Sequence, residues 1–338
     1  MFLSVIIPTY RNTKEEIERC LGSIYQSDWR DFEVLLADDG NTADYAAYLD
    51  TLPVRFPGLR ILHLPHGGES SARNGGIKAA KGEFILFADA DDVVSKQFCL
   101  DIQEIAEDEP SVDVIYGRVQ NAKVAHFADD LCEELKFYEL NEDERRELYG
   151  HFFALQVKKY VKADGAYLSR GPIARLVRRT LALRCPFRLG LIMGPDMVWN
   201  LDMLKGNPRV AVTDHVWYYI VGNPESVTRG YRPEFVEWHR QLLQVLREYI
   251  TPDTKKDYRQ RIYESLAEIG RKYYLSPQNS LSWFQKVKEF NQVAWSEPFD
   301  AVLETNEKMG GGKGLLKLVF YKTGLLLYAY KLKMLLGR

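Results

Sequence analysis

Three aspartates follow a short apolar run in residues 85–92, which read ILFADADD. The carboxylates of Asp89, Asp91 and Asp92 are close enough in sequence to repel one another, so they need a positively charged partner. Alternate carboxylates at the end of a buried strand suit a divalent cation, or a phosphate group that carries one. These residues are therefore the first candidates for a functional site.

Three kinds of site use such a cluster. A calcium loop of the EF-hand type is excluded, because the fifth position is Val93, no glycine follows at the sixth, and a strand precedes the acids. An aspartyl-nucleophile phosphatase matches the letters DADDV and would use one carboxylate as nucleophile and another as acid/base beside magnesium. In a metal–nucleotide site of the Asp-x-Asp type, one acid binds the ion and the other orients a ribose.

The elements that must position these acids alternate between strand and helix. Apolar runs predict strands at 3–10, 32–40, 59–65 and 83–92, and helical spacing predicts helices at 14–27 and 70–82. This alternation is typical of a parallel sheet, whose ligands bind beyond the carboxyl ends of the strands. The polar stretches PTY, DDG, LPHGG and DADD at those ends should therefore meet at one rim. The phosphatase interpretation places the acids on the fourth strand and leaves DDG and ARN without a use.

The pattern is looser beyond residue 110. We expect a strand at 112–119, a solvated helix or loop at 129–147, a strand running into a helix at 171–182, a helix at 197–204, a strand at 210–221 and amphipathic helices over 234–308. The glycines at 310–312 predict a hinge. The expected domains are 1–230, with halves 1–110 and 111–230, then a helical region 231–309 and a tail 310–338.

Composition limits the possible partners and compartments. The net charge of −2 over 338 residues argues against a nucleic-acid partner. Four widely spaced cysteines without a CxxC pair fit a reducing compartment. The N-terminal sequence MFLSVIIPTYR lacks a basic region before its apolar run, so a strand is favoured over a signal peptide. We expect a cytoplasmic protein.

The tail differs in charge from the rest of the chain. Residues 308–338 hold seven basic residues and no acidic one, which leaves −9 for the remainder. Lysines interrupt its apolar residues, so no stretch reaches the ~18 residues of a spanning helix. We expect a helix at the membrane surface that is separable from the folded domains; the alternative is a C-terminal helix that packs on the protein or on a second copy.

An ordered series of motifs resembles the family 2 glycosyltransferases, which are inverting enzymes of the GT-A fold. The series is SVIIPTYRN (4–12), FEVLLADDGN (32–41), GGESSARNGGIKAAKGEFILFADADD (67–92), GPIARLVRR (171–179), GPDMVWNLDML (194–204) and ESVTR (225–229). It covers about two-thirds of the chain. The resemblance implies an α/β fold with a Rossmann-like nucleotide-diphospho-sugar transferase domain and a C-terminal helical extension.

The resemblance also implies roles for residues of the rim. Tyr10 would be the platform for the nucleotide base, with Thr9 contacting the base through its backbone. Asp39 would accept a hydrogen bond from the base edge, and Arg73 would reach the diphosphate or the base. Asp89 would orient the ribose, and Asp91 would bind Mn²⁺ or Mg²⁺. Each has a plain structural alternative, such as a core tyrosine or a salt bridge on a helix face.

Asp196 matches the aspartate that serves the family as general base. The family pattern is Gly-Glu-Asp before a helix, and this chain has Pro195 in place of the glutamate. Proline is tolerated at a helix start, so the helix and Asp196 should persist. The alternative is that Asp196 is only an N-cap. His215 could be a third metal ligand but is more often structural, and Arg229 falls where the family has a mobile loop.

The resulting expectation is inverting transfer of a sugar from a nucleotide-diphosphate sugar, with a UDP-sugar as the expected donor, to a hydroxyl of a glycan or lipid-linked glycan. The setting would be synthesis of a cell-surface polysaccharide at the inner face of the membrane. A non-catalytic glycan-binding member of the fold stays open, because Pro195 removes one supporting carboxylate, and the phosphatase stays open beside it. The oligomeric state is not predictable from these patterns.

Overall fold

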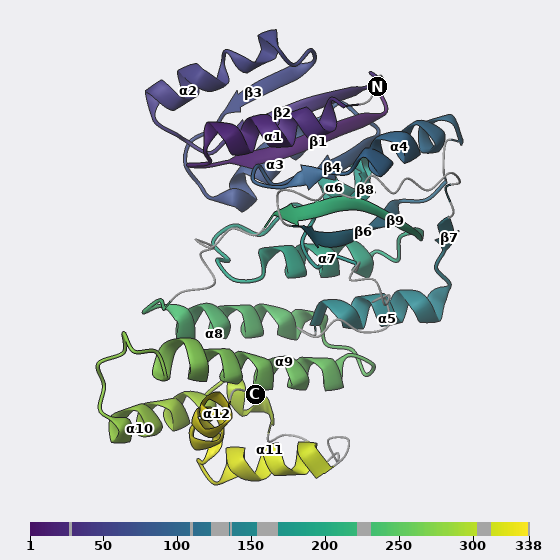
Figure 1. Cartoon of the computed structure of the whole chain (residues 1–338). Helices are drawn as coiled ribbons and strands as arrows, with labels where there is room; N and C mark the ends of the chain where they lie inside the picture. Colours follow the sequence, from purple (N-terminus) through teal and green to yellow (C-terminus); the bar gives the residue numbers. More distant parts are fainter. Residues whose placement is uncertain are drawn as a thin grey trace. The chain divides into compact units, whose positions relative to one another are not determined.

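Within the described residues, nine strands form one mixed sheet (Figure 1). The computed structural model describes residues 1–26, 29–108, 111–122, 135, 137–153, 168–221, 231–302 and 312–336. The strands are β1 (Leu3–Thr9), β2 (Phe32–Asp38), β3 (Leu59–His63), β4 (Phe84–Phe87), β5 (Val93–Val94), β6 (Val114–Ala122), β7 (Phe137–Glu139), β8 (Arg175–Arg178) and β9 (Val210–Val221). The order is β3-β2-β1-β4-β8-β6-β9-β5, with β7 paired to β9.

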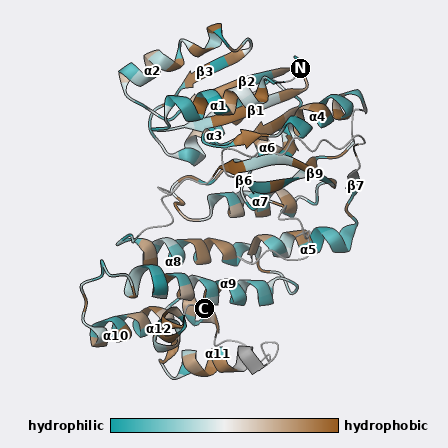
Figure 2. Ribbon diagram, in the orientation of Figure 1, coloured by the Kyte–Doolittle hydropathy of each residue, from teal (hydrophilic) through white to brown (hydrophobic). Residues whose placement is uncertain are grey.

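The first four strands of that order are parallel, as the alternating pattern predicts. β8 is antiparallel to both β4 and β6, and β9 runs parallel to β6. Every residue of β1 is buried, which is the signature of a parallel strand covered on both faces. Figure 2 shows the hydrophobic end of its colour scale concentrated in these strands.

Helices cover both faces of the parallel strands. The helices between residues 14 and 205, not all of which touch the parallel strands, are α1 (Lys14–Ile24), α2 (Ala43–Leu49), α3 (Glu69–Ala79), α4 (Lys96–Asp108), α5 (Glu142–Phe153), α6 (Arg179–Arg184) and α7 (Pro195–Lys205), with a 3₁₀ turn η1 (Leu52–Val54). Val5 and Ile7 belong to the same buried cluster as Ile17 of α1. Ile6 points to the opposite face, where Gly76 lets α3 approach so closely that a Cβ would overlap the Ile6 side chain.

Several elements differ from the expectation. The predicted strand 83–92 ends at Phe87, because the Asp92 amide N–H donates to the Asp89 carbonyl and turns the chain. The acids therefore lie on a turn after β4. The interval 129–147 contains β7 and α5 where it is described, and α5 buries Leu148 and Phe152. A helix at 96–108 was not anticipated, although Phe98, Ile102 and Ile105 are buried at helical spacing.

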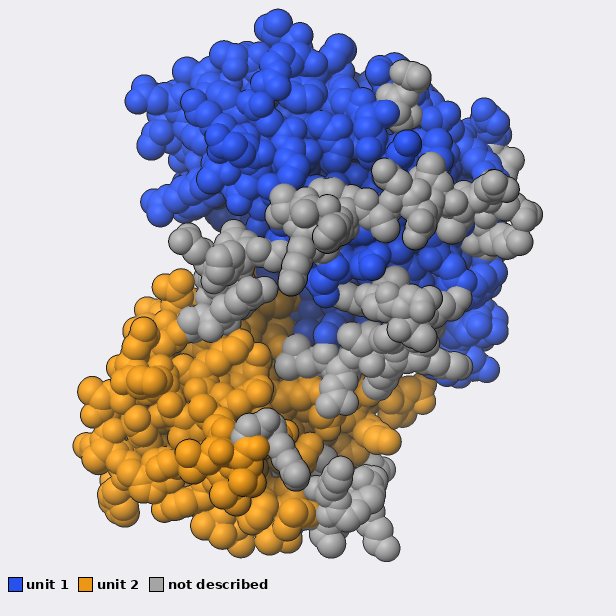
Figure 3. Space-filling view, in the orientation of Figure 1, with its two compact units in different colours: residues 1–152, 156–190, 195–223 blue, residues 153–155, 191–194, 224–338 orange. Residues whose placement is uncertain are grey.

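The chain divides into two units (Figure 3). Unit 1 comprises residues 1–152, 156–190 and 195–223, and unit 2 comprises 153–155, 191–194 and 224–338. Unit 2 contains α8 (Phe235–Leu246), η2 (Arg247–Tyr249), α9 (Lys255–Glu268), the π-helical η3 (Ile269–Tyr274), α10 (Trp283–Ala294), η4 (Phe299–Val302), α11 (Gly312–Lys322) and α12 (Leu326–Leu335). Most of the expected hinge at 310–312 lies outside the described residues, and the expected boundary at 230 does as well.

The expected tail is built into unit 2. Tyr321 is buried, and its hydroxyl donates to the carbonyl oxygens of Ala294 and Phe299. Leu326 and Leu327 are also buried. The expectation of a separable tail is therefore wrong for α11 and α12. Removing these helices would expose apolar surface and would leave buried polar groups without hydrogen-bond partners. In the part of the chain that the structure describes, no helix has the length and apolarity needed to cross a membrane.

Candidate active site

The polar ends of β1, β2 and β4 meet at one rim of the sheet. In the parallel register, Thr9 pairs with Asp38 and Asp38 pairs with His63. Because β4 lies on the other side of β1, the turn that carries Asp89 follows at the same edge. The rim predicted from the strand ends is thus present, and α3 begins there at Glu69.

Asp39 is a buried anchor of this rim. Its two carboxylate oxygens accept hydrogen bonds from the amide N–H groups of Gly67 and Gly68, each at 2.9 Å. His66 Nδ1 lies 2.8 Å from the same carboxylate. Each oxygen retains lone-pair capacity, so a base edge would share Asp39 with the 66–68 loop rather than find it free. Glycine is required at position 40 for this close approach of the 66–68 loop. The φ of Gly40 is +73°, and a Cβ there would come 2.7 Å from the backbone nitrogen of His66.

Tyr10 presents a partly exposed ring, 38% accessible, at the end of β1. The ring stacks on His66 with centroids 4.4 Å apart and an interplanar angle of 21°. The guanidinium of Arg11 lies 4.9 Å from the ring centroid. Thr9 is buried, and its carbonyl oxygen already accepts from the Asp39 amide and the Asn41 side chain. A base contact to that carbonyl would have to displace one of these bonds.

Asp38 holds the turn beside Asp39. It accepts hydrogen bonds from the backbone and side chain of Asn41 at 3.0 and 2.8 Å, and His63 Nδ1 lies 2.8 Å away. Burial would raise the pKa of Asp38, but the hydrogen bonds from Asn41 and His63 outweigh it and lower that pKa. Asp38 therefore serves the turn.

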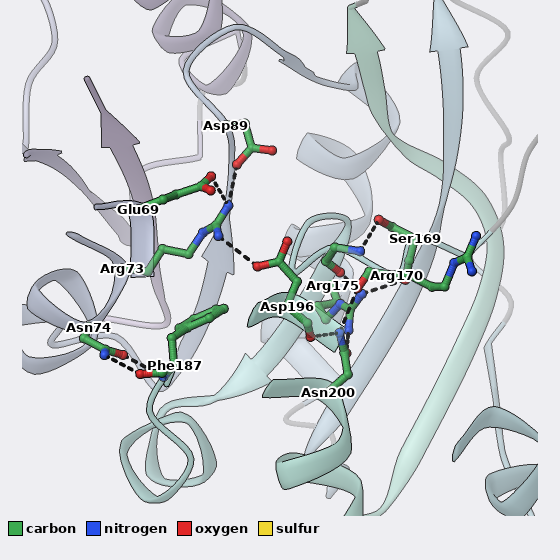
Figure 4. A network of polar contacts seen from close by, with 11 residues as sticks. Glu69, Arg73, Asn74, Asp89, Ser169, Arg170, Arg175, Phe187, Asp196 and Asn200 are labelled. Carbon is green, nitrogen blue, oxygen red and sulfur yellow. Dashed lines mark hydrogen bonds and ion pairs between the residues drawn. The ribbon is translucent and has the colours of Figure 1, made fainter. Parts of the chain in front are cut away.

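Arg73 is the centre of the charged network in Figure 4. Its side chain is 1% exposed, and its guanidinium donates to Glu69 at 2.6 Å, Asp89 at 2.9 Å and Asp196 at 3.0 Å. This guanidinium is the positive partner of Asp89, one of the three acids after β4. Burial would lower the pKa of Arg73, but the three carboxylates raise it, so the residue remains charged.

Asp196 lies in the first turn of α7, which begins at Pro195, two residues before the expected start at 197. Because it follows the first helical residue, Asp196 is not the N-cap, and its carboxylate points to Arg73 instead (Figure 4). Its side chain is 31% exposed, which leaves room for a reacting hydroxyl. Burial raises the pKa of Asp196, Arg73 and Arg175 lower it, and Asp89 adds to the rise; the net direction is upward.

A second arginine fixes the backbone around Asp196. The Asn200 side chain donates to the carbonyl oxygens of Asp196 and Arg170, at 2.7 and 3.0 Å. The fully buried Arg175 in turn donates to the Asn200 side chain and to the carbonyl of Ser169. Burial lowers the pKa of Arg175. Both residues lie within motifs named above, but no role was assigned to them, because their pairing across the fold is not visible in the sequence.

Asp91 and Asp92 differ in their surroundings. Asp91 is half-buried, and its carbonyl accepts from Arg19 at 2.5 Å. Asp92 is buried and accepts the amide N–H of Val221 at 2.8 Å, so it joins the turn to β9. Burial, and then the charge of Asp89, raises the pKa of Asp92 to about 8. The Ser95 hydroxyl caps α4 by accepting a hydrogen bond from the amide N–H of Phe98.

The donor set fits a hard divalent cation that is held jointly with a ligand. Among the described residues no group of three His, Cys, Asp or Glu side chains is arranged to hold a metal alone. His215 lies 2.8 Å from Asp101 in the interior, which agrees with the structural alternative. Mg²⁺ and Mn²⁺ commonly take one or two carboxylates plus phosphate oxygens, which Asp91 with a diphosphate would supply.

Two further residues of the site, Glu69 and Tyr218, are not predicted from the sequence. Glu69 opens α3 and is a third carboxylate on Arg73, and its spacing of four residues from Arg73 on one helix could have indicated the pair. Tyr218 of β9 accepts the Asp89 amide N–H at 2.8 Å, and no local pattern indicates that contact. Arg229 lies outside the described residues.

Comparisons with known proteins agree with this architecture. Residues 4–155 match the family described as Glycosyl transferase family 2. The chain is 36% identical over 240 residues to the uncharacterized glycosyltransferase EpsJ of Bacillus subtilis (strain 168), covering 70% of this chain and 65% of EpsJ. It is 32% identical over 120 residues to glycosyltransferase GlyG of Streptococcus pneumoniae serotype 4, covering 35% and 39%. The match thus spans less than two-thirds of either relative.

The fold also has a solved counterpart. A crystal structure of S. aureus TarS 1-349 in complex with UDP-GlcNAc superposes with a TM-score of 0.63 at 20% identity, over 100% of this chain and 93% of that chain. This likeness shows a GT-A-like fold with a helical C-terminal region. The motifs and these matches together identify residues 4–155 as a domain of glycosyl transferase family 2.

Proposed function

We propose that the chain is an inverting glycosyltransferase that moves a sugar from a nucleotide-diphosphate sugar to a hydroxyl group of a glycan. One observation carries the proposal. Arg73 joins Asp196, the candidate base, to Asp89 of the Asp-x-Asp pair, although Arg73 and Asp196 are 123 residues apart in sequence. A base beside a nucleotide-binding acid pair is the arrangement that a transfer reaction requires.

The donor would lie along the rim. Tyr10, Thr9 and Asp39 would contact the base, Asp89 the ribose and Asp91 the metal, as the family resemblance implies. A bound Mn²⁺ or Mg²⁺ would neutralise the charge of the departing diphosphate. Arg73 is enclosed by three carboxylates, so it would act on the diphosphate through its charge more readily than through a direct contact. UDP is the first nucleotide to test, because the TarS counterpart was solved with UDP-GlcNAc.

Asp196 would act as the general base. Its carboxylate would take the proton of the acceptor hydroxyl while that oxygen forms a bond to the anomeric carbon. The bond from that carbon to the diphosphate oxygen breaks, and the electron pair leaves with the nucleotide diphosphate. A single in-line displacement of this kind inverts the anomeric centre. The buried Arg175–Asn200 pair holds the helix turn from which Asp196 projects.

The acceptor would be a glycan or lipid-linked glycan at the inner face of the membrane, as in cell-surface polysaccharide synthesis. Exposed residues of α11, of α12 and of the turn between them support contact with an anionic membrane. They include apolar side chains and lysines together: Leu316, Val319, Leu325, Leu332, Leu335, Lys317, Lys322, Lys331 and Lys333. Such a surface can insert its apolar groups while the lysines meet lipid headgroups.

A two-step assay tests the proposal. Calorimetry with UDP and Mn²⁺ should show nucleotide binding that disappears when a chelator removes the metal. A panel of UDP-sugars should then show release of UDP, increased by a glycan acceptor. Metal-dependent binding without any turnover would favour a non-catalytic member of the family, and absence of nucleotide binding would contradict the proposal outright. The family match leaves no support for the phosphatase interpretation.

A further inference from the structure

Arg73 makes its contacts from an enclosed position. Its guanidinium is almost fully buried, whereas Asp89 and Asp196 are each 31% exposed and Glu69 is 56% exposed. One positive charge therefore lies behind three carboxylates that face the rim. A substrate meeting the rim would reach the carboxylates before it reached Arg73.

The surroundings of Arg73 hold the guanidinium in place. Asn74, the next residue of α3, exchanges two hydrogen bonds of 2.8 Å with the backbone of Phe187. The Phe187 ring lies 5.4 Å from the guanidinium and stacks on Trp199 of α7. Figure 4 shows Asn74 and Arg73 reaching from the same helix to Phe187 and Asp196. α3 is therefore fastened at two adjacent points to the segment that carries Asp196.

We propose that Arg73 is a positioning residue that holds the Asp196 carboxylate in its charged form and in a fixed direction, while binding Asp89 on the donor side. This inference rests on the role proposed for Asp196 above. It replaces the expectation of a direct nucleotide contact for Arg73. The acceptor itself would meet Asp196, and Arg73 would act only through that carboxylate.

The charges around Asp196 decide the sign of the effect. Arg73 of α3 and Arg175 of β8 favour the ionised form of Asp196, whereas Asp89 of the turn after β4 opposes it. Glu69 forms an ion pair with the same Arg73 guanidinium. Among these groups Arg73 makes the direct ion pair with the Asp196 carboxylate, and Arg175 reaches only the backbone of that turn through Asn200. Loss of the Arg73 charge should raise the pKa of Asp196, and a base that is protonated at neutral pH cannot accept a proton.

The test measures the titration of Asp196 directly. The protein is labelled with ¹³C at aspartate carboxyl groups, and Asp196→Asn identifies the resonance of interest. Arg73→Gln should move its titration midpoint upward by about one to three pH units, the usual effect of an adjacent arginine. Arg73→Lys keeps the charge and should move it less. Asn74→Ala, on the same helix, removes the two hydrogen bonds to the Phe187 backbone without changing the charge. It should leave the titration midpoint at the parental value.

Turnover and binding provide the second readout. In Arg73→Gln the acid limb of the pH profile of kcat should move to higher pH together with the titration midpoint of Asp196. The value of kcat at pH 7 should fall more than the affinity for UDP. An unmoved midpoint in folded Arg73→Gln, or an equal shift in Asn74→Ala, would overturn the positioning role. So would a loss of UDP affinity with the midpoint unmoved, because Arg73 would then be a donor ligand. If the parent transfers no sugar but the midpoint moves, the proposed function fails while the coupling of Arg73 to Asp196 stands.

Discussion

At the scale of single residues, Asp91 and Asp196 have different proposed tasks within one charged network. Arg73 binds Asp89 and Asp196, and the metal is assigned to Asp91. The two tasks can be separated, because one concerns donor binding and the other concerns proton transfer. Substitution of each residue should therefore change a different measured quantity.

Asp91→Ala should abolish metal-dependent binding of UDP, because it removes the carboxylate that would join the ion to the protein. Calorimetry with UDP, with and without Mn²⁺, measures this. Asp44→Ala removes an exposed carboxylate in the first turn of α2 and serves as the control, with binding expected to be unchanged. Parental affinity in Asp91→Ala would remove this residue from the metal site.

Asp196→Asn should leave donor affinity nearly unchanged and reduce turnover by about 10²–10⁴, the usual effect of losing a general acid–base group. Asparagine keeps the size of the side chain and can still accept a hydrogen bond from Arg73, so the helix turn should persist. The measurement pairs the dissociation constant for the donor with kcat. Turnover close to that of the parent would show that another group accepts the proton.

At the scale of elements, the close contact of α3 with β1 fixes the position of the helix backbone that carries Arg73. Gly76 lies inside α3, and a methyl group there would overlap Ile6 of β1. Gly22 lies inside α1, and a methyl group there would meet no atom within 4 Å. The two glycines thus share a helical setting and differ in the space around them.

Gly76→Ala should lower the free energy of unfolding by about 1–3 kcal/mol, because the added methyl overpacks a tight contact. Gly22→Ala should raise it by up to about 1 kcal/mol, since alanine is the better helix former and space is available. Denaturant unfolding of both variants beside the parent measures the difference. Equal effects of the same sign would mean that α3 can shift away from β1 at little cost.

The sequence predicts the parallel strands and their shared rim, because each strand is a continuous apolar run that ends in polar residues. It also predicts the helix after Pro195, since proline is tolerated at a helix start, although that helix begins two residues before the expected 197. It does not predict that Arg73 is buried. That depends on Asp196, which approaches only after the chain has crossed through β6 and β8, so no local pattern could show which acids share the guanidinium.

At the scale of the whole molecule, the C-terminal helices combine exposed leucines with lysines and bury Tyr321 in unit 2. Truncation is therefore a poor test of membrane contact, because it would disturb the fold of that unit. Charge reversal at exposed lysines changes the surface and leaves Tyr321, Leu326 and Leu327 in place.

The combined change of Lys317, Lys322 and Lys333 to Glu should weaken binding to anionic vesicles by at least about 100-fold, at ~1 kcal/mol for each lysine lost. Co-sedimentation with vesicles measures this, and added salt should weaken binding of the parent. The matched control changes Lys78, Lys81 and Lys96 of unit 1, which are also exposed, to Glu. Equal loss in both triple variants would point to net charge rather than to this surface.

Trp199 should provide a fluorescence signal for the charged network around Arg73. Its indole is fully buried and lies parallel to the Phe187 ring, 4.7 Å between centroids, and that ring lies beneath the Arg73 guanidinium. Indole emission responds to the field of nearby charges and to the packing of neighbouring rings. Any rearrangement of Arg73 and its carboxylates should therefore alter the intrinsic fluorescence of Trp199. The difference spectrum between the parent and Trp199→Phe would isolate this signal, so that events at the site could be followed in stopped flow without a label.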